Sequence, residues 1–449
     1  MGSRLPELIR FAAKPLPPIS DSSFGSYFDH LGKYKVVLLG DGSHGTSEFY
    51  QARAEITKHL IEHHGFDTVA VEADWPDAES VDRYVRQRPG PKGKISYGEE
   101  EPFQRFPTWM WRNKEVQDFV HWMRDHNAQL PPEQRAGFYG LDVYSMGRSI
   151  RAIIQYLERV DPAMAKVARR RYSCLERWVD DPAQYGLATY VDSGMGTCEG
   201  AVIKMLRELL EKRLQYTTDE HDGEEFHSVE QNAYLVADAE SYYRAMYSSS
   251  ADSWSLRDSH MFETLRRLLN RNKENCKAIV WAHNSHIGDA RYTSMGRQRG
   301  ELNLGQLCRE NLGRENTTLV GCGTHTGTVA AAHQWDEDVR FMDVLPSRPD
   351  SWEYLVHQTE IPSFLVHLRR GVASSELRSK FEAASPRLER FIGVIYRPIT
   401  ERLSHYSSAD MADQFDAFVW FDVTKAVQPL EKTQPRTPLG ADETYPFGL

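Results

Sequence analysis

The chain has 449 residues, beyond the size at which one hydrophobic core usually stops growing, so we expect a large domain with an insertion or two domains. Apolar residues make up 40% and charged residues 26%, values that exclude wholesale disorder. The formal net charge is −10 and no basic stripe is present, which argues against nucleic acid as a partner.

The cysteine content and the N-terminal sequence bear on the cellular compartment. The five cysteines are odd in number and contain no C-x-x-C pair, so they predict neither a zinc knuckle nor a dithiol redox motif. Sparse, unpaired thiols are typical of a reducing compartment. The first residues lack the apolar core of a signal peptide, and no apolar run approaches the ~18 residues of a membrane span. We expect a cytoplasmic protein with no membrane partner, and its oligomeric state stays open.

Three short apolar runs alternate with three segments of helical spacing in the first part of the chain. Alternation of this kind predicts parallel strands connected by helices that cover both faces of a sheet. In chain order the predicted elements are a strand at Lys35–Gly40, a helix from Thr46 to about His63, a strand at Asp67–Ala73, helices at Asp77–Gln87 and Asn113–Asn127, and a strand at Gly137–Val143.

The rhythm breaks between Ser145 and Lys273, a long, charged and mostly helical stretch that we interpret as an insertion forming a lid or a cleft wall. Strands return at Lys277–Ala282, Thr317–Cys322, Phe364–Leu368, Ile392–Tyr396 and Ala417–Phe421. Pro, Thr and Gly density predicts a loosely held tail over residues 431–449. The expected fold is therefore one α/β domain over residues 1–449, with a mostly parallel central sheet flanked by helices and a helical insertion at 145–273.

Titratable residues appear where four of the predicted strands run out. Because the carboxyl ends of parallel strands meet at one edge of a sheet, where ligand crevices form, these side chains are expected to share a site. Structural ion-pair networks produce similar clusters, so the pattern alone does not prove a site. The residues are Asp41 and His44 after the first strand, Glu72 and Asp74 at the end of the second, Asp142 in the third, and His283 and His286 after the fourth.

Each of these residues also has a structural interpretation. His44 lies between glycines, as a turn residue would, and no G-x-S-x-G elbow surrounds Ser43, which argues against a serine nucleophile. The spacing of His283 and His286 differs from the i, i+4 pair of helical metal motifs. We therefore expect no metal and no cofactor, and a metal-dependent hydrolase stays an alternative.

Several longer segments resemble the erythromycin esterase family, from about Leu38 to about Leu430. The matching segments are LGDGSHGT (39–46) with Glu48-Phe49, VEA (71–73), WAHNSH (281–286) and GVIYRP (393–398). FPTWMWRN (106–113) and SHY (404–406) resemble a broad subgroup of that family.

The resemblance implies a hydrolase that opens the lactone of a macrolide by metal-independent attack of water. His44 takes the position of the general base, and the surrounding site residues are Arg53, Glu72, His283 and His286. Asp41 stands where the family has glutamate, one methylene longer, and Gly42 beside it offers a different backbone path. This difference places the identity of the substrate in more doubt than the type of reaction.

The leading interpretation is a hydrolase that cleaves a carboxylic ester or lactone of a small natural product, with His44 activating water. The catalytic candidates are His44, Glu72, His283, His286, Asp41 and Arg53, and the substrate-binding candidates are Asp74, Asp142, Arg257, Asp258 and His325. A lyase or isomerase that uses the same histidine as a base is the first alternative. A binding protein that retains the fold is the second, and the complete set of polar groups argues against it.

Overall fold

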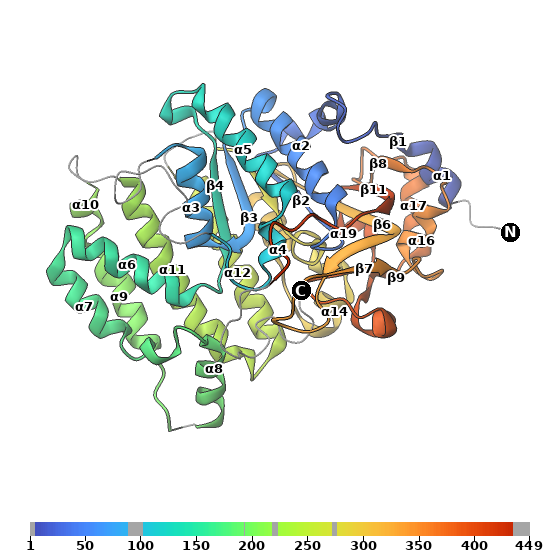
Figure 1. Cartoon of the computed structure of the whole chain (residues 1–449). Coiled ribbons are helices and arrows are strands. Elements are labelled where there is room, and N and C mark those ends of the chain that lie inside the picture. Colours follow the sequence, from blue (N-terminus) through green and yellow to red (C-terminus); the bar gives the residue numbers. More distant parts are fainter. Residues whose placement is uncertain (1–4, 89–101, 193, 218–222, 272–275, 434–449) are drawn as a thin grey trace.

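The computed structural model describes residues 5–88, 102–192, 194–217, 223–271 and 276–433. Nine strands form one sheet in the order β1-β8-β11-β6-β2-β5-β3-β4, with β7 pairing beside β6 (Figure 1). Their bounds are β1 Lys14–Pro15, β2 Val36–Leu39, β3 Thr68–Asp74, β4 Gly137–Asp142, β5 Ala278–Trp281, β6 Thr317–Ala331, β7 Arg340–Val344, β8 Ser363–His367 and β11 Ala417–Thr424. A separate two-stranded sheet pairs β9 (Arg387–Arg390) with β10 (Tyr406–Ala409).

The six strands from β11 to β4 are parallel, and β1, β7 and β8 pair antiparallel at the margins. The predicted α/β fold with a mostly parallel sheet is confirmed. Seven of the eight predicted strands correspond to strands of this sheet.

Helices cover both faces of the sheet, which explains why the strands are continuous apolar runs. Val37 and Leu39 of β2 face one core together with α2 (Ser47–His64) and α5 (Lys114–Ala128). Val36 and Leu38 face the other core, together with α12 (Ser250–Leu269) and α15 (Leu304–Leu312). Further helices of the fold are α3 (Trp75–Val85), the 3₁₀ helix η1 (Phe24–Lys33) and α16 (Trp352–His357).

The chain between β4 and β5 is helical in its described part, as expected for the insertion. Its helices gather at the β4 edge of the sheet, where α12 contacts β4 and α11 contacts α3 (Figure 1). They are α6 Met146–Val160, α7 Pro162–Tyr172, α8 Pro182–Val191, α9 Glu199–Glu211, α10 Arg213–Tyr216, α11 Gly223–Met246 and α12. Cys174 and Cys198 form a disulfide within the insertion, so the expectation of unpaired thiols is wrong for these two.

Two further predictions concern the C-terminal part of the chain. Ile392–Tyr396 is not a strand: the segment makes isolated bridges, in which Ile392 pairs with Ser43 and Ile395 with Ala332. Its apolar residues are buried because the segment lies across the loop that follows β2, rather than inside the sheet. The predicted C-terminal tail lies outside the described residues from position 434 onward. No helix in the described part of the chain is both long enough and apolar enough to cross a bilayer.

Candidate active site

The candidate site lies at the carboxyl ends of four adjacent strands, β2, β5, β3 and β4. His44 is held there by the loop after β2. Its backbone N–H donates to the carbonyl of Ile392 (3.1 Å), and Ile392 N–H donates back to the carbonyl of Gly42 (3.0 Å). Gly45 packs against strand β6 so closely that a Cβ would lie 1.8 Å from the carbonyl oxygen of Ala330. The glycines of this loop therefore allow the close backbone contact that fixes His44.

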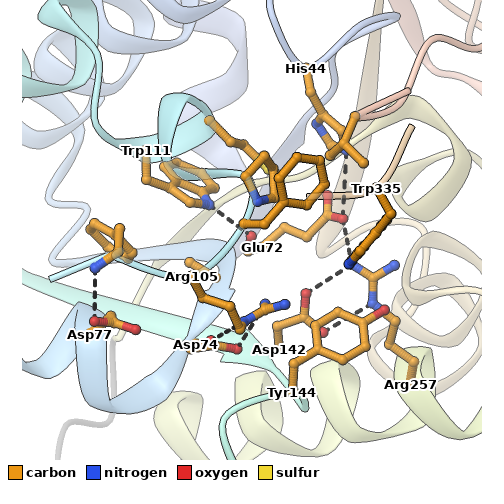
Figure 2. Close-up of a pocket in the computed structure, with 16 residues that line it drawn as sticks. His44, Glu72, Asp74, Asp77, Arg105, Trp111, Asp142, Tyr144, Arg257 and Trp335 are labelled. Carbon is orange, nitrogen blue, oxygen red and sulfur yellow. Dashed lines mark hydrogen bonds and ion pairs between the residues drawn. The ribbon is translucent and has the colours of Figure 1, made fainter. Parts of the chain in front are cut away.

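The His44 ring is buried between the carboxylates of Asp41 and Glu72, and Figure 2 shows its contact with Glu72. Its Nδ1 lies 3.4 Å from Asp41 Oδ1, and its Nε2 lies 3.9 Å from Glu72 Oε1. The ring of His283 is also close, with 4.9 Å between the two ring centroids. Each ring nitrogen of His44 therefore faces a carboxylate, and these contacts orient the ring, as a general base requires.

Asp41 is in turn held by Arg53, whose Nη1 lies 2.5 Å from Asp41 Oδ2. The Arg53 guanidinium is buried over the rings of Tyr50 and Trp281, with distances of 4.5 and 5.3 Å to the ring centroids. Burial opposes ionisation of Asp41, but Arg53 and His44 outweigh it, and the pKa of Asp41 is lowered. Asp41 is therefore a carboxylate at neutral pH, and Arg53 acts on the site through it.

Glu72, on β3, is the centre of the ionic network. Its Oε1 accepts from Arg257 Nη2 (2.7 Å) and lies 3.3 Å from His286 Nε2, while Oε2 accepts from the backbone N–H of His283 (2.9 Å). Burial alone would raise the pKa of Glu72, but His286, His44 and Arg257 lower it well below its usual range. Arg257, from α12, also makes a two-pronged contact with Asp142 of β4, at 3.0 and 2.8 Å.

His286 lies behind Glu72, with its ring stacked on Trp254 at a centroid distance of 4.5 Å. Its Nδ1 contacts Asp258 Oδ2 at 2.9 Å, and Asp258 also accepts from the backbone N–H of Leu304 at 2.8 Å. Burial lowers the pKa of His286, but Asp258 and Glu72 overcome this effect and raise it to about 9. The raised pKa favours the protonated ring, whose Nε2 lies 3.3 Å from Glu72 Oε1 and 3.2 Å from Arg257 Nη1.

A pH-dependent stability follows from this raised pKa. The stabilisation is fully present below pH 6.5, the ordinary value, and is lost as the pH rises through about 9. We expect the free energy of unfolding of the unmodified chain to fall more steeply over this range than that of His286→Gln, by at most about 3 kcal/mol. Urea melts at a series of pH values measure both curves, and parallel curves would contradict the assignment of charge to His286.

His283 differs from His286 in its charge. Burial, followed by the neighbouring His44, lowers the pKa of His283 to about 3, so the ring is neutral. Its Nδ1 accepts from the backbone N–H of Ser285 (3.3 Å), which places the ring proton on Nε2. That Nε2 is buried beside His44 without a hydrogen-bond partner. His283 therefore presents a neutral N–H donor next to the candidate base.

The pocket in front of these residues has an acidic floor and an aromatic wall (Figure 2). Arg105 Nε donates to Asp74 Oδ2 at 3.0 Å, and Trp111 Nε1 donates to the backbone carbonyl of Glu72 at 3.1 Å. Burial raises the pKa of Asp77 to about 6 against the opposing effect of Arg148. The lining residues are His44, Glu72, Ala73, Asp74, Asp77, Phe103, Arg105, Phe106, Pro107, Met110, Trp111, Asp142, Tyr144, Arg257, Trp335 and Val394.

The predicted residues therefore divide into two groups. One group lines the pocket: His44, Glu72, Asp74, Asp142 and Arg257. The other group lies behind the first and contacts it directly or through one residue: Asp41, Arg53, His283, His286 and Asp258. Of the described insertion residues, one lines the pocket, Arg257 of α12.

His325 is not part of this arrangement, which corrects its prediction as a substrate-binding residue. Its Nδ1 contacts Ser347 Oγ at 2.6 Å, and its ring stacks on His357 of α16 at a centroid distance of 3.6 Å. Strand β6 continues far beyond Val320, its last residue paired with β2, and it carries His325 to the side of β7 and α16.

Asp77, Arg105, Tyr144 and Trp335 line the pocket but were not identified from the sequence. Arg105 and Trp335 come from segments without regular structure, and no motif marks them. Phe106, Pro107, Met110 and Trp111 of the FPTWMWRN segment also line the pocket, and the resemblance of this segment to a family subgroup was the one sequence signal for them. Within the described residues, the one group of three with metal-ligand geometry is Asp29, His59 and His64, outside this pocket.

Comparisons with known proteins identify relatives of this chain. The model of the erythromycin esterase family matches residues 61–424. The putative hydrolase YbfO of Bacillus subtilis (strain 168) is 22% identical over 305 residues, which is 65% of each chain. Erythromycin esterase type II of Escherichia coli is 24% identical over 119 residues, 26% of each chain. The chain thus spans less than two thirds of the length of these curated relatives.

Solved structures share the fold at low identity. A Bacillus cereus protein has a TM-score of 0.76 at 19% identity, covering 95% of this chain and 99% of its own. A succinoglycan biosynthesis protein has a TM-score of 0.73 at 18% identity, with 95% and 98% covered. A mutant of the erythromycin esterase EreC in its open conformation has a TM-score of 0.61 at 17% identity, with 93% and 96% covered. With the family model matching most of its length, the chain belongs to the erythromycin esterase family.

Proposed function

We propose that this protein is a hydrolase that cleaves a carboxylic ester or lactone of a small natural product with a water molecule activated by His44. The observation that carries the proposal is the position of His44, which lines the pocket while its two ring nitrogens face Asp41 and Glu72. A buried base that borders a pocket and is oriented by a carboxylate is what the deprotonation of water requires.

The proposed reaction begins with water bound in the pocket beside His44 Nε2. The water oxygen forms a bond to the carbonyl carbon, its proton moves to Nε2, and the π electrons of the carbonyl move onto oxygen. Asp41, held by Arg53, has its Oδ1 3.4 Å from Nδ1, and its negative charge stabilises the resulting imidazolium. When the tetrahedral intermediate collapses, the bond to the leaving oxygen breaks, and that oxygen takes the proton from His44. The products are a carboxylic acid and an alcohol.

Two further groups position the reacting residues. The Nε2–H of His283 is a neutral donor without a partner. Because His283 lies behind the pocket lining, with its ring 4.9 Å from that of His44, we assign it the positioning of His44. Glu72 has its charge neutralised by Arg257 and His286, so we assign it the positioning of these groups rather than proton transfer. Asp142 shares Arg257 with Glu72 and belongs to the same positioning layer.

The pocket also favours a substrate class. Aromatic and apolar side chains including Phe106, Trp111 and Trp335 form one wall, while Asp74 and Asp77 provide acceptors on the other side. This combination suits a ligand with a large apolar surface and a few hydroxyl or amine donors, as many lactone natural products have. Two relatives, an erythromycin esterase and a putative hydrolase, support the same reaction class.

Oxygen-isotope labelling tests the reaction type. Lactones and carboxylic esters are incubated with the protein in ¹⁸O-water, and the products are examined by mass spectrometry. We expect each product acid to carry one solvent oxygen, because water attacks the carbonyl carbon. A product formed without solvent oxygen would instead support the lyase or isomerase that uses His44 for proton abstraction from carbon.

A further inference from the structure

A second cluster of histidines lies at the far end of α2, away from the candidate active site. Helix α2 begins at Ser47 beside the loop that holds His44 and ends at His64. At 1.5 Å per residue, its length separates the two ends by about 25 Å. The 3₁₀ helix η1 packs along this far part of α2 and presents Asp29 to it.

Two imidazoles converge on one carboxylate in this cluster. His59 Nε2 lies 2.6 Å and His64 Nε2 lies 2.9 Å from the same oxygen, Oδ1 of Asp29. One ligand atom of each residue lies within 4.8 Å of the other two. Residues five apart do not share a face of a regular helix. His64 is the last residue of α2, directly before the left-handed Gly65 (φ 68°), and at this helix end its ring reaches the same carboxylate as His59.

The rings are placed by two glycines of η1. A Cβ on Gly25 would lie 2.5 Å from His59 Cβ, and one on Gly32 would lie 2.1 Å from His64 Nδ1. Only residues without a side chain at these two positions let α2 and η1 approach this closely. Lys277 fixes the same corner, because its Nζ donates to the carbonyls of Gly32 (2.6 Å) and His64 (3.0 Å).

The cluster is both pre-ordered and accessible. The side chains of His59 and His64 are 15% and 24% exposed, so packing restricts their rotamers, whereas Asp29 is 61% exposed and borders solvent. Imidazole nitrogens and a carboxylate oxygen are ligands that Zn²⁺ accepts, at about 2.0–2.2 Å each. A small outward rotation of the exposed Asp29 carboxylate separates its oxygen from the two nitrogens and leaves room for an ion between them.

We propose that Asp29, His59 and His64 bind a divalent transition-metal ion of the zinc type, with water completing the coordination. The bound ion joins η1 to the end of α2, so it stabilises the folded chain and takes no part in the reaction at His44. Each imidazole must present an unprotonated Nε2, and binding therefore weakens as the solution is acidified.

Zinc titration of the full chain tests the proposal, by calorimetry and by thermal melting after treatment with a chelator. We expect Zn²⁺ to raise the melting temperature, and Asp29→Asn, His59→Gln and His64→Gln each to weaken zinc binding at least about tenfold. His63→Gln is the matched control. His63 lies one turn from His59, with 4.6 Å between the ring centroids, but its side chain is 58% exposed and it is not part of the converging group.

The control also gives the outcomes that overturn the proposal. If His63→Gln loses zinc while Asp29→Asn and His64→Gln keep it, the ligands are the i, i+4 helical pair His59 and His63. If zinc raises the melting temperature of every variant by as much as it raises that of the unmodified chain, the cluster does not bind the ion and is an ordinary hydrogen-bonded ion pair. Melting without zinc is measured for every variant, so a loss of stability is not mistaken for a loss of binding.

Discussion

His44→Ala is expected to lower turnover by about 10²–10⁴-fold, while KM changes little. The substitution removes the proposed base and leaves Glu72, Arg257 and the aromatic wall in place to bind substrate. Turnover and melting temperature are measured on the same preparation, with the substrate that the labelling experiment identifies.

His325→Ala is the matched control for this experiment. Both histidines lie in loops or strand extensions near the carboxyl edge of the sheet, but His325 faces Ser347 and His357 and does not line the pocket. We expect His325→Ala to retain normal turnover. A folded His44→Ala protein with normal turnover would refute the proposed mechanism, even if that protein melted earlier than the unmodified chain.

The sequence predicted the sheet because its parallel strands are covered on both faces. Such strands must be apolar at every position, so VVLL at 36–39 and AIVW at 278–281 stand out from the amphipathic helices around them. The same reasoning located the site, since a charged residue directly after such a run must lie at the carboxyl edge. Four strands marked in this way, β2, β5, β3 and β4, proved to be neighbours.

The predictions from sequence were wrong for apolar residues that are buried for a reason other than membership of a sheet strand. Ile392 and Val394 are buried because their segment covers the loop that carries His44, and a local pattern cannot separate this from a strand. His325 was misplaced because the length of β6 past Val320 is set by its pairing with β7 and β11, which no local pattern encodes.

The pocket wall was hardest to predict, because its contacts join distant segments. Arg105 contacts Asp74 across 31 positions, and Trp335 packs on Phe106 with 4.8 Å between ring centroids. Neither residue lies in a periodic segment, and an exposed loop would contain the same residue types. Only the fold places them against the acidic side of the pocket.

Arg257→Met is expected to destabilise the folded chain by about 3–5 kcal/mol at neutral pH and to reduce turnover strongly. The guanidinium is buried, and it is the cation that Glu72 and Asp142 share, at 2.7 and 2.8 Å. Methionine fills a similar volume, but it leaves two carboxylates buried without that cation. Urea melts measure the loss, and Arg257→Met combined with Asp142→Asn should recover part of it, because one of the two charges is then absent.

The pH dependence distinguishes a lost ion pair from lost packing. In the unmodified chain, burial opposes ionisation of both carboxyl groups. His286, His44 and Arg257 nevertheless lower the pKa of Glu72, and Arg257 lowers that of Asp142. The stabilisation from these two groups is therefore present above their ordinary pKa values and is lost as the pH falls through the lowered ones. In Arg257→Met the two carboxylates stay buried but lack this cation, so protonating them as the pH falls stabilises the folded variant. The difference in unfolding free energy between the unmodified chain and Arg257→Met should therefore become smaller between about pH 7 and about pH 5.

Arg267→Met on the same helix is the comparison. Its hydrogen-bond partners Gln231 and Thr264 are neutral, and Asp238, Glu263 and Glu230 act on it without a hydrogen bond to its guanidinium, so its smaller loss should narrow less. If the difference in unfolding free energy between the unmodified chain and Arg257→Met stayed constant with pH, packing rather than charge would account for the role of Arg257.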